Sequence, residues 1–468
     1  MNKPYASRRK FLRQLGSAAA LVPLGSLNTL AAQEEYERHI LSEEKRISAN
    51  DKIRLAVIGT GIMGHQNLGH ALSIPGAELA AACDLYTGRL DRMKELHGKD
   101  LRVTRDYREL LERDDIDAVI VATSDHWHAR IAMDAMEKGK HVYCEKPMVH
   151  QIKEGLPLIK TWQQTKKVMQ VGSQNISSLH TQKAQELFKA GAIGKLNCIE
   201  ATYDRQSALG AWQYTMPTDG SPQTVDWDRY IAGMPKQAYD AKKFFWWRNY
   251  KEFGTGVAGD LFVHLLTSIH SIIGSTGPNK IFASGELTRW KDGRNVPDMM
   301  VAVLNYPETA NHPEFQMTLR VNFASGGGED SLIRFFGDEG VLDYGWSSLK
   351  IRNSIMSKAP GIGGWDSLSS YPEAMQKEIL AKYNATYSEA DKQRPKKDPI
   401  EYVPPAGHNP NQVHWANFLD GVRMNKQVIE DPIVAFRACA PTLACNDSYF
   451  EKKIINWDPN AMKVTKGA

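Results

Sequence analysis

IRLAVIGTGIMG, at residues 53–64, joins an apolar run to a glycine-rich turn, and a helical pattern follows it. A buried strand, a glycine turn and a helix are the context that a dinucleotide-binding fingerprint requires. Gly59 permits the tight turn, Gly61 lets the backbone approach a pyrophosphate, and Gly64 lets the helix pack closely on the strand. With Ile62 and Met63 between them, these positions predict the phosphate-binding end of a dinucleotide cofactor site.

A second strand is expected from Glu78 to Cys83, and Asp84 follows it, twenty residues after Gly64. An acidic residue at this distance accepts hydrogen bonds from the adenosine ribose, and its charge disfavours the 2′-phosphate of NADP. The sequence therefore predicts NAD in preference to NADP, with Arg89 nearby as a residue that softens this preference.

Strands and helices continue to alternate along the next hundred residues. Apolar strands are expected at 117–122 and 140–144, with an amphipathic helix over 129–138 between them. This alternation predicts an α/β fold with a doubly wound parallel sheet over residues 51–172. Thr123 falls at the carboxyl end of a strand, where such sheets bind ligands, and His128 follows it on the side expected for the nicotinamide.

Several short motifs then follow one another in a fixed order across residues 51–450. They are Ala122-Thr123, His128, GKHV at 139–142, Glu145-Lys146-Pro147, AGAIGK at 190–195, GDLFVH at 259–264 and HWANFL at 414–419. Their content and order resemble the Gfo/Idh/MocA family of sugar and polyol oxidoreductases. The resemblance implies that residues 173–468 form a substrate-binding domain with an open, mostly antiparallel sheet, and that the protein is a homo-oligomer, a dimer or a tetramer. It also implies that Glu145 lies beside the cofactor.

Oxidation of an alcohol by hydride transfer needs a base for the hydroxyl proton and positive charge near the developing carbonyl. Asp260 and His264 are four residues apart and would share one face of a helix. The resemblance implies that His264 is the proton acceptor and donor at the substrate hydroxyl. It implies that Lys146, which also borders the cofactor, is the electrostatic partner of His264, and that Asp260 is a positioning residue or an alternate base. An unperturbed histidine base would titrate near pH 6.5.

Two further segments have more than one interpretation. The aromatic run at 246–250 suits sugar stacking, with Arg248 and Tyr250 as the first candidates for substrate contact, but such runs also form cores. The polar, lysine-rich stretch at about 361–405 is expected to be an excursion from the second domain that covers the cleft or contacts another subunit. No group of His, Cys or Asp has the spacing of metal ligands, so no metal is predicted.

The first 50 residues indicate the compartment. Residues 1–32 contain the pair Arg8-Arg9, a short apolar run broken by Gly and Pro, and a small-residue end at Ala31-Ala32. This pattern predicts a twin-arginine signal peptide and export to the periplasm, and residues 33–50 are expected to form a polar arm. The net charge of the chain is only +4, and five basic side chains of the leader account for it, so nucleic-acid binding is not expected. No segment predicts a membrane span.

These features together predict an exported, NAD-dependent oxidoreductase that oxidises a hydroxyl of a sugar or glycoside, such as C3 of a glucoside, with a tightly bound nicotinamide. One alternative is an NAD-dependent glycosidase, in which transient oxidation at C3 acidifies the C2 proton, the aglycone is eliminated and the hydride is returned. A second alternative is a sugar-binding protein without enzymatic activity.

Overall fold

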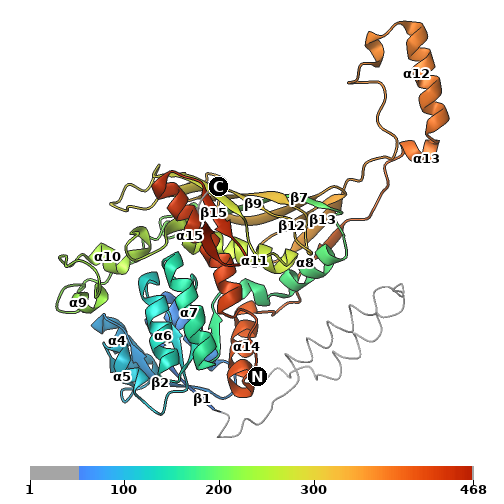
Figure 1. The fold of residues 1–468 in the computed structure, drawn as a ribbon. Helices are drawn as coiled ribbons and strands as arrows, with labels where there is room; N and C mark the ends of the chain where they lie inside the picture. The colour runs from blue at the N-terminus through green and yellow to red at the C-terminus, as the bar shows by residue number, and fades with distance from the viewer. Residues whose placement is uncertain (1–51, 466–468) are drawn as a thin grey trace, which may run out of the picture. The chain divides into compact units, whose positions relative to one another are not determined.

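The computed structural model describes residues 52–465; the expected signal peptide at 1–32 and arm at 33–50 lie outside this range. The described chain builds a six-stranded sheet followed by a ten-stranded sheet, with helices packed on both (Figure 1). Within this range, no helix combines the length and the apolar character that crossing a membrane requires.

The first sheet is parallel, with the strand order β3-β2-β1-β4-β5-β6. This is the strand order of dinucleotide-binding Rossmann folds, so the expected fold class of the first domain is confirmed. Its elements are β1 (Ile53–Ile58), α3 (Ile62–Leu72), β2 (Ala77–Cys83), α4 (Thr87–His97), β3 (Arg102–Thr104), α5 (Tyr107–Leu111), β4 (Ala118–Val121), η2 (Asp125–Trp127), α6 (His128–Glu137), β5 (His141–Cys144), α7 (Ile152–Thr165) and β6 (Met169–Val171).

The second sheet has the order β14-β13-β12-β11-β7-β10-β9-β8-β15-β16, and its neighbouring strands are antiparallel except that β7 and β10 run parallel. The expected open, mostly antiparallel sheet is therefore confirmed. Its strands are β7 (Leu196–Asp204), β8 (Lys280–Glu286), β9 (Met299–Tyr306), β10 (Phe315–Asn322), β11 (Asp330–Gly337), β12 (Gly340–Tyr344), β13 (Leu349–Asn353), β14 (Ile400–Tyr402), β15 (Ile455–Asp458) and β16 (Lys463–Thr465).

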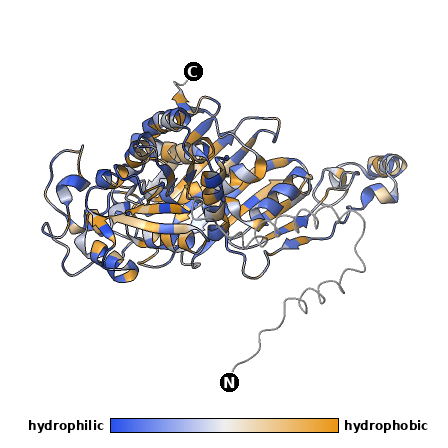
Figure 2. Ribbon diagram, turned by 90° about the horizontal axis from the view of Figure 1, so that it is seen from below, coloured by the Kyte–Doolittle hydropathy of each residue, from blue (hydrophilic) through white to orange (hydrophobic). Residues whose placement is uncertain are grey.

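One face of this sheet is covered by helices and the other is not. Residues of β8 alternate strictly between exposed and buried positions, as expected for a sheet with one packed face. Orange and blue residues accordingly alternate along the strands in Figure 2. The remaining helical elements are η3 (Gln174–Ser177), α8 (Leu179–Lys189), α9 (Trp227–Tyr230), α10 (Ala241–Phe245), η4 (Trp247–Asn249), the π-helical turn η5 (Ala258–Phe262), α11 (Val263–Ile273), η6 (Leu368–Ser370), α12 (Glu373–Thr386), α13 (Glu389–Lys392), α14 (Pro410–Met424) and α15 (Pro432–Glu451).

Helix α14 returns to the first sheet although the chain has already built the second one. Trp415, Phe418 and Leu419 of α14 are fully buried in one cluster with residues of β1 and β4. The Trp415 ring stacks on that of Tyr143 in β5 at 3.9 Å, and its Nε1 donates a hydrogen bond to Asn67 in α3. The sequence motif at 414–419 therefore belongs to the core around the first sheet, whereas the sequence analysis assigned all of 173–468 to the second domain.

The excursion at 361–405 does not cover the pocket of its own chain. None of the residues of α12 or α13 is buried. In Figure 1 both helices project away from the sheets, on the side opposite α9 and α10. Of the two roles expected from the sequence, covering the cleft within the same subunit is not what this structure shows.

Candidate active site

The glycine turn has the geometry that the fingerprint predicts. Gly59 has a φ of +88°, and a Cβ there would lie 2.6 Å from the carbonyl oxygen of Ala122. A Cβ on Gly64 would lie 2.0 Å from the carbonyl oxygen of Gly59, so helix and strand approach too closely for any side chain. At Gly61 the nearest atoms to a Cβ are those of the Arg89 guanidinium, at 3.6 Å or more. The turn therefore has glycine where the fold requires it and open space where a pyrophosphate would lie, which fits a dinucleotide.

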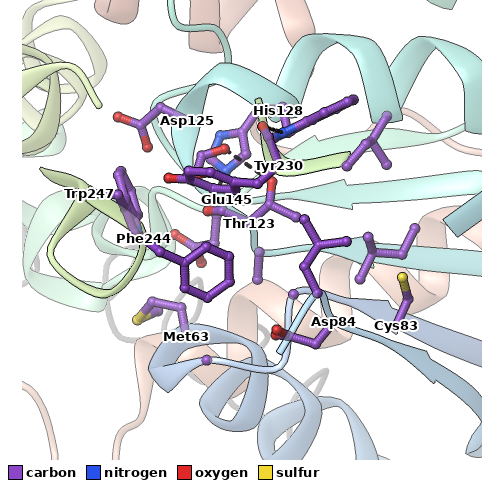
Figure 3. Close-up of a pocket in the computed structure, with 18 of the residues that line it drawn as sticks. Met63, Cys83, Asp84, Thr123, Asp125, His128, Glu145, Tyr230, Phe244 and Trp247 are labelled. Carbon is purple, nitrogen blue, oxygen red and sulfur yellow. Dashed lines mark hydrogen bonds between the residues drawn. The ribbon is translucent and has the colours of Figure 1, made fainter. Parts of the chain in front are cut away.

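A large pocket extends from this turn across the carboxyl ends of the parallel strands (Figure 3). In the close-up, Met63 and Asp84 lie in the lower part, Thr123 and Glu145 lie near the centre, and Asp125 and Trp247 lie on the left. The sequence-predicted residues that line it are Gly59, Gly61, Ile62, Met63, Asp84, Thr123, His128, Glu145, Lys146 and Arg248.

Asp84 contributes to the pocket wall and also holds the loops around it. One carboxylate oxygen accepts hydrogen bonds from the backbone N–H of Thr60 at 2.8 Å and from its hydroxyl at 3.2 Å. The other accepts from the backbone N–H of Tyr86 at 2.9 Å. The Arg89 guanidinium lies 3.6 Å from Asp84 and faces the same pocket. Asp84 and Arg89, which the sequence led us to expect close to each other beside the cofactor, both line this pocket.

Lys146 and Asp260 form an ion pair where the two domains meet. The Lys146 ammonium donates to the Asp260 carboxylate at 2.8 Å and to its main-chain oxygen at 2.9 Å, and the two side chains are only 9% and 5% exposed. Arg248 Nε donates to the same carboxylate oxygen at 3.3 Å. Burial alone would raise the pKa of Asp260, but the charges of Lys146 and Arg248 outweigh it and lower the pKa below its ordinary value. Asp260 is therefore an ionised anchor for two cations, which favours the positioning role over the alternate-base role.

His264 lies one turn beyond Asp260, at the start of α11. Burial, and next the charge of Lys146, lowers the pKa of His264 to about 3. The ring is neutral at ordinary pH and able to accept a proton, but it does not titrate near 6.5. Asp260 itself lies in the π-helical turn η5, a feature that often occurs at functional sites and that the sequence spacing did not reveal.

Glu145 and His128 are both fixed by hydrogen bonds to other parts of the protein. The Glu145 carboxylate, 4% exposed, accepts hydrogen bonds from Asn67 at 2.8 Å and Gln174 at 3.3 Å, and burial raises its pKa. The ring nitrogens of His128 lie 2.8 Å from the Pro147 carbonyl oxygen and 3.2 Å from that of Thr123. His128 thus joins the strand end at Thr123 to the loop that carries Lys146.

Asp125 is a pocket residue that the sequence analysis did not select. One of its oxygens accepts from the backbone N–H and the hydroxyl of Thr255, and the other has no hydrogen-bond partner within the described residues. It is 1% exposed, and burial raises its pKa. The sequence did not single it out, because an aspartate that follows a strand is equally typical of a helix cap. Among residues 52–465, no three His, Cys, Asp or Glu side chains are grouped as metal ligands would be.

In the aromatic segment between β7 and η5, the residues that line the pocket are not all those expected from the sequence. Tyr250 is 6% exposed and packs in an aromatic cluster with residues such as Trp227 and Phe253, outside the pocket wall. The structure therefore uses this ring in packing and does not place it on the pocket wall, and its substrate contact stays a prediction. Residues of the same segment that do line the pocket are Tyr214, Arg229, Tyr230, Phe244, Phe245, Trp247 and Arg248.

This segment is attached directly to the first domain. Tyr86 pairs with Val225 in an isolated β-bridge, and its ring meets that of Phe245 edge-on at 5.3 Å. Trp127 Nε1 donates to the Tyr230 carbonyl oxygen at 2.9 Å. The pocket is thus walled on one side by the glycine turn and on the other by aromatic residues from the second domain.

A Rossmann sheet with this glycine cradle defines a dinucleotide-binding domain, and a buried lysine–aspartate pair lies beside it. Residues 53–173 match the "Oxidoreductase family, NAD-binding Rossmann fold" of the Gfo/Idh/MocA proteins, and residues 220–343 match the "GFO/IDH/MocA C-terminal domain". The chain belongs to the Gfo/Idh/MocA family, as the sequence motifs indicated.

Similar proteins of known sequence and structure agree with this assignment. The chain is 29% identical over 212 residues to a glycosyl hydrolase family 109 protein of Shewanella baltica. The aligned region covers 42% of this chain and 45% of the relative. It is 33% identical over 163 residues to an alpha-N-acetylgalactosaminidase of Shewanella oneidensis, and this alignment covers 32% of this chain and 35% of the relative. The matched regions thus span less than half of these curated relatives.

Two solved structures share the fold. A levoglucosan dehydrogenase, in complex with NADH and levoglucosan, aligns with a TM-score of 0.58 at 16% identity, covering 86% of this chain and 99% of that one. An aldose-aldose oxidoreductase from Caulobacter crescentus aligns with a TM-score of 0.61 at 15% identity and the same coverage.

Proposed function

We propose that the protein is an NAD-dependent oxidoreductase that oxidises a hydroxyl of a sugar or glycoside and holds its nicotinamide tightly. The observation that carries this proposal is the buried Lys146–Asp260 pair, whose lysine lines the dinucleotide pocket together with Arg248. NAD is favoured over NADP because Asp84 places a carboxylate at the ribose end.

In this reaction, charged and neutral side chains have different roles. Bound nicotinamide supplies the hydride acceptor, and the protein has to handle the proton and the charge on the substrate oxygen. Lys146 places a fixed cation at the reacting centre, since its ammonium is anchored to Asp260 at two oxygens. A preorganised cation of this kind stabilises an alkoxide-like oxygen without rearranging during the reaction. His264, neutral because of burial and the charge of Lys146, accepts the proton, and Arg248 contributes a second donor for the sugar.

The decisive experiment is to analyse the protein as isolated. Nucleotide released from it should be close to one equivalent of NAD by absorbance and mass. Addition of a substrate glycoside alone should then raise the absorbance near 340 nm in a single turnover. A protein that emerges empty and turns over only with a large excess of added NAD would contradict tight retention, and no absorbance change with any sugar would contradict the oxidoreductase reaction.

A redox-neutral glycosidase is the second candidate, and the similarity to the two Shewanella proteins named as glycosyl hydrolases favours it. In this cycle, oxidation of the sugar is transient and the hydride returns to it after the aglycone has left. Release of free aglycone without net NADH supports the glycosidase, whereas accumulation of a keto sugar supports the dehydrogenase.

We further propose that the protein is exported by the twin-arginine route as a homo-oligomer, with its cofactor already bound. The support is the Arg8-Arg9 pair with the short apolar run that follows. Replacing both arginines by lysine should retain the protein in the cytoplasm. Export that continues in this variant would contradict the proposed route.

A further inference from the structure

One wall of the cofactor pocket comes from the second domain and reaches the adenosine end. Phe244, Phe245 and Arg229 line the pocket together with Asp84, the residue expected beside the adenosine ribose. With this wall in place, the free space in the pocket is about 200 Å³, whereas sites for whole small ligands have roughly 300–1,000 Å³. A dinucleotide is larger than such ligands, so this wall has to move outwards when NAD enters or leaves.

The wall belongs to a segment with a small aromatic core of its own. We call residues 214–250 the clasp segment; they include α9 and α10, on the left of Figure 1. Its buried apolar residues pack in one cluster, which contains Val225, Trp227, Tyr230, Ile231, Phe244, Phe245 and Tyr250. Phe253, just beyond the segment, and Tyr86 of the first domain complete the buried members of this cluster. Because most of this core is internal to the clasp segment, the segment can move as a unit while its own packing stays intact.

Polar contacts attach the clasp segment to the first domain at two places. The first place is where β2 passes into α4, and there the Thr87 N–H donates to the Thr224 carbonyl oxygen at 2.9 Å. The Arg105 guanidinium, which follows β3, donates to the same oxygen at 2.9 Å. The Tyr86 hydroxyl donates to the Asp219 carboxylate. Since Arg105 also lines the pocket, this attachment lies directly beside the cofactor site.

The second place is the loop after β4. Trp127 Nε1 donates to the Tyr230 carbonyl oxygen at 2.9 Å, and His126 Nε2 lies 3.0 Å from the same oxygen. Arg229, next to Tyr230, lies 3.6 Å from the Asp106 carboxylate. A hydrogen bond of this kind contributes only modestly, because water satisfies the same groups when the contact opens. The closed position is therefore held by several weak contacts that can open without unfolding either domain.

We propose that the clasp segment is a retention device for the cofactor. It moves away from the loops after β2, β3 and β4 to admit the nucleotide, and it then closes over the adenosine half. The proposal rests on the proposed function, since it takes NAD as the ligand of this pocket and names the part of the chain that retains it. Release of the cofactor then requires the contacts of the clasp segment to break, in addition to those of the nucleotide itself.

The test fixes the clasp segment with a reversible cross-link. Tyr86 and Val225 face each other as a non-hydrogen-bonded antiparallel pair, and the Cα spacing of about 4.5 Å in such pairs suits a disulfide. The double variant Tyr86→Cys/Val225→Cys is compared in its oxidised and reduced forms, so each preparation is its own control. NADH is the probe, and energy transfer from tryptophan reports its uptake and its displacement by excess NAD. The wild type receives the same oxidant, because its own five cysteines are free.

We expect oxidation to slow NADH release from the loaded double variant by about tenfold or more, and to slow uptake by the empty one similarly, because several contacts can no longer open. A second variant, Asp219→Ala, keeps the aromatic core and removes only the hydrogen bond from Tyr86. It should speed release by about three- to tenfold, as expected for one exposed hydrogen bond. Glu373→Ala is the matched control, because it removes an exposed ion pair with Lys377 on α12 and should leave release unchanged.

Equal rates of release and uptake in the oxidised and reduced forms would overturn the clasp. If the double variant does not fold, Asp219→Ala decides, and an unchanged release rate would then overturn it. Failure of the proposed function gives a different result, in which NADH release still depends on the cross-link but no sugar or glycoside reduces bound NAD. A wild-type protein that binds neither NADH nor NADPH would refute both proposals.

Discussion

The acid side of the pH–rate profile depends on where His264 titrates. With a pKa of about 3, nearly all His264 rings are neutral at pH 5, whereas an unperturbed pKa near 6.5 would leave only about one ring in 30 neutral. Because the base must be neutral to accept a proton, the rate falls as pH drops through the pKa of the folded protein. We therefore expect hydride transfer at pH 5 to be nearly as fast as at pH 7.5, and not about 30-fold slower.

The assay is single-turnover hydride transfer followed at 340 nm from pH 4.5 to 8, using cofactor-loaded protein. His264→Gln should slow the reaction across the whole range without moving an acid limb into it. NMR of histidine-labelled protein, with His264→Gln to assign the signal, measures the same ionisation without catalysis. An acid limb near pH 6.5 that disappears in His264→Gln, with a matching NMR titration, would refute the argument that burial and Lys146 keep this ring neutral.

Three further predictions concern the ion pair and the cofactor cradle. Lys146→Ala should lower turnover by about two orders of magnitude or more and leave the nucleotide bound, since it removes charge at the reacting centre but no phosphate contact. Measuring the nucleotide content and kcat on one sample checks this prediction. Asp260→Asn should lower the free energy of unfolding by about 3–5 kcal/mol at pH 7, because two buried cations lose their carboxylate; urea unfolding measures the loss, and a loss below about 1 kcal/mol, as for a surface pair, would contradict it. Gly64→Ala should destabilise the apoprotein, because a Cβ there meets a carbonyl oxygen at 2.0 Å. Gly61→Ala should keep apoprotein stability within about 1 kcal/mol while weakening NAD binding, and equal effects of the two glycine variants on stability would be inconsistent with the cradle described.

Local patterns in the sequence predicted the cofactor end of the site well. The glycine turn, Asp84 and Thr123 are set by strand–turn–helix geometry, which is encoded within a short stretch of chain. The burial of Tyr250 in an aromatic cluster could not be predicted from such a short stretch. Neighbours from elsewhere in the chain, such as Tyr86 and Trp227, decide whether an aromatic ring enters a core or a pocket.

Prediction of the reacting centre from the sequence was limited in the same way. Spacing placed Asp260 and His264 on one face, but the π-helical turn at 258–262 and the low pKa of His264 depend on tertiary packing. The value near 6.5 describes a solvated ring, whereas burial lowers the pKa of His264 in the folded protein. The return of α14 to the first sheet escaped prediction because an amphipathic helix does not specify which sheet it packs on.

The position of α14 has a consequence for biosynthesis. Trp415 fills the core against Tyr143 and, through Asn67, supports the carboxylate of Glu145 in the pocket. A nascent chain that has emerged only as far as β6 has all six strands of the first sheet but lacks this part of its core. We therefore expect the nucleotide-binding half to mature only after residue 424 has left the ribosome, so that cofactor loading would be a late event. Such an order would suit the export with bound cofactor that we propose above.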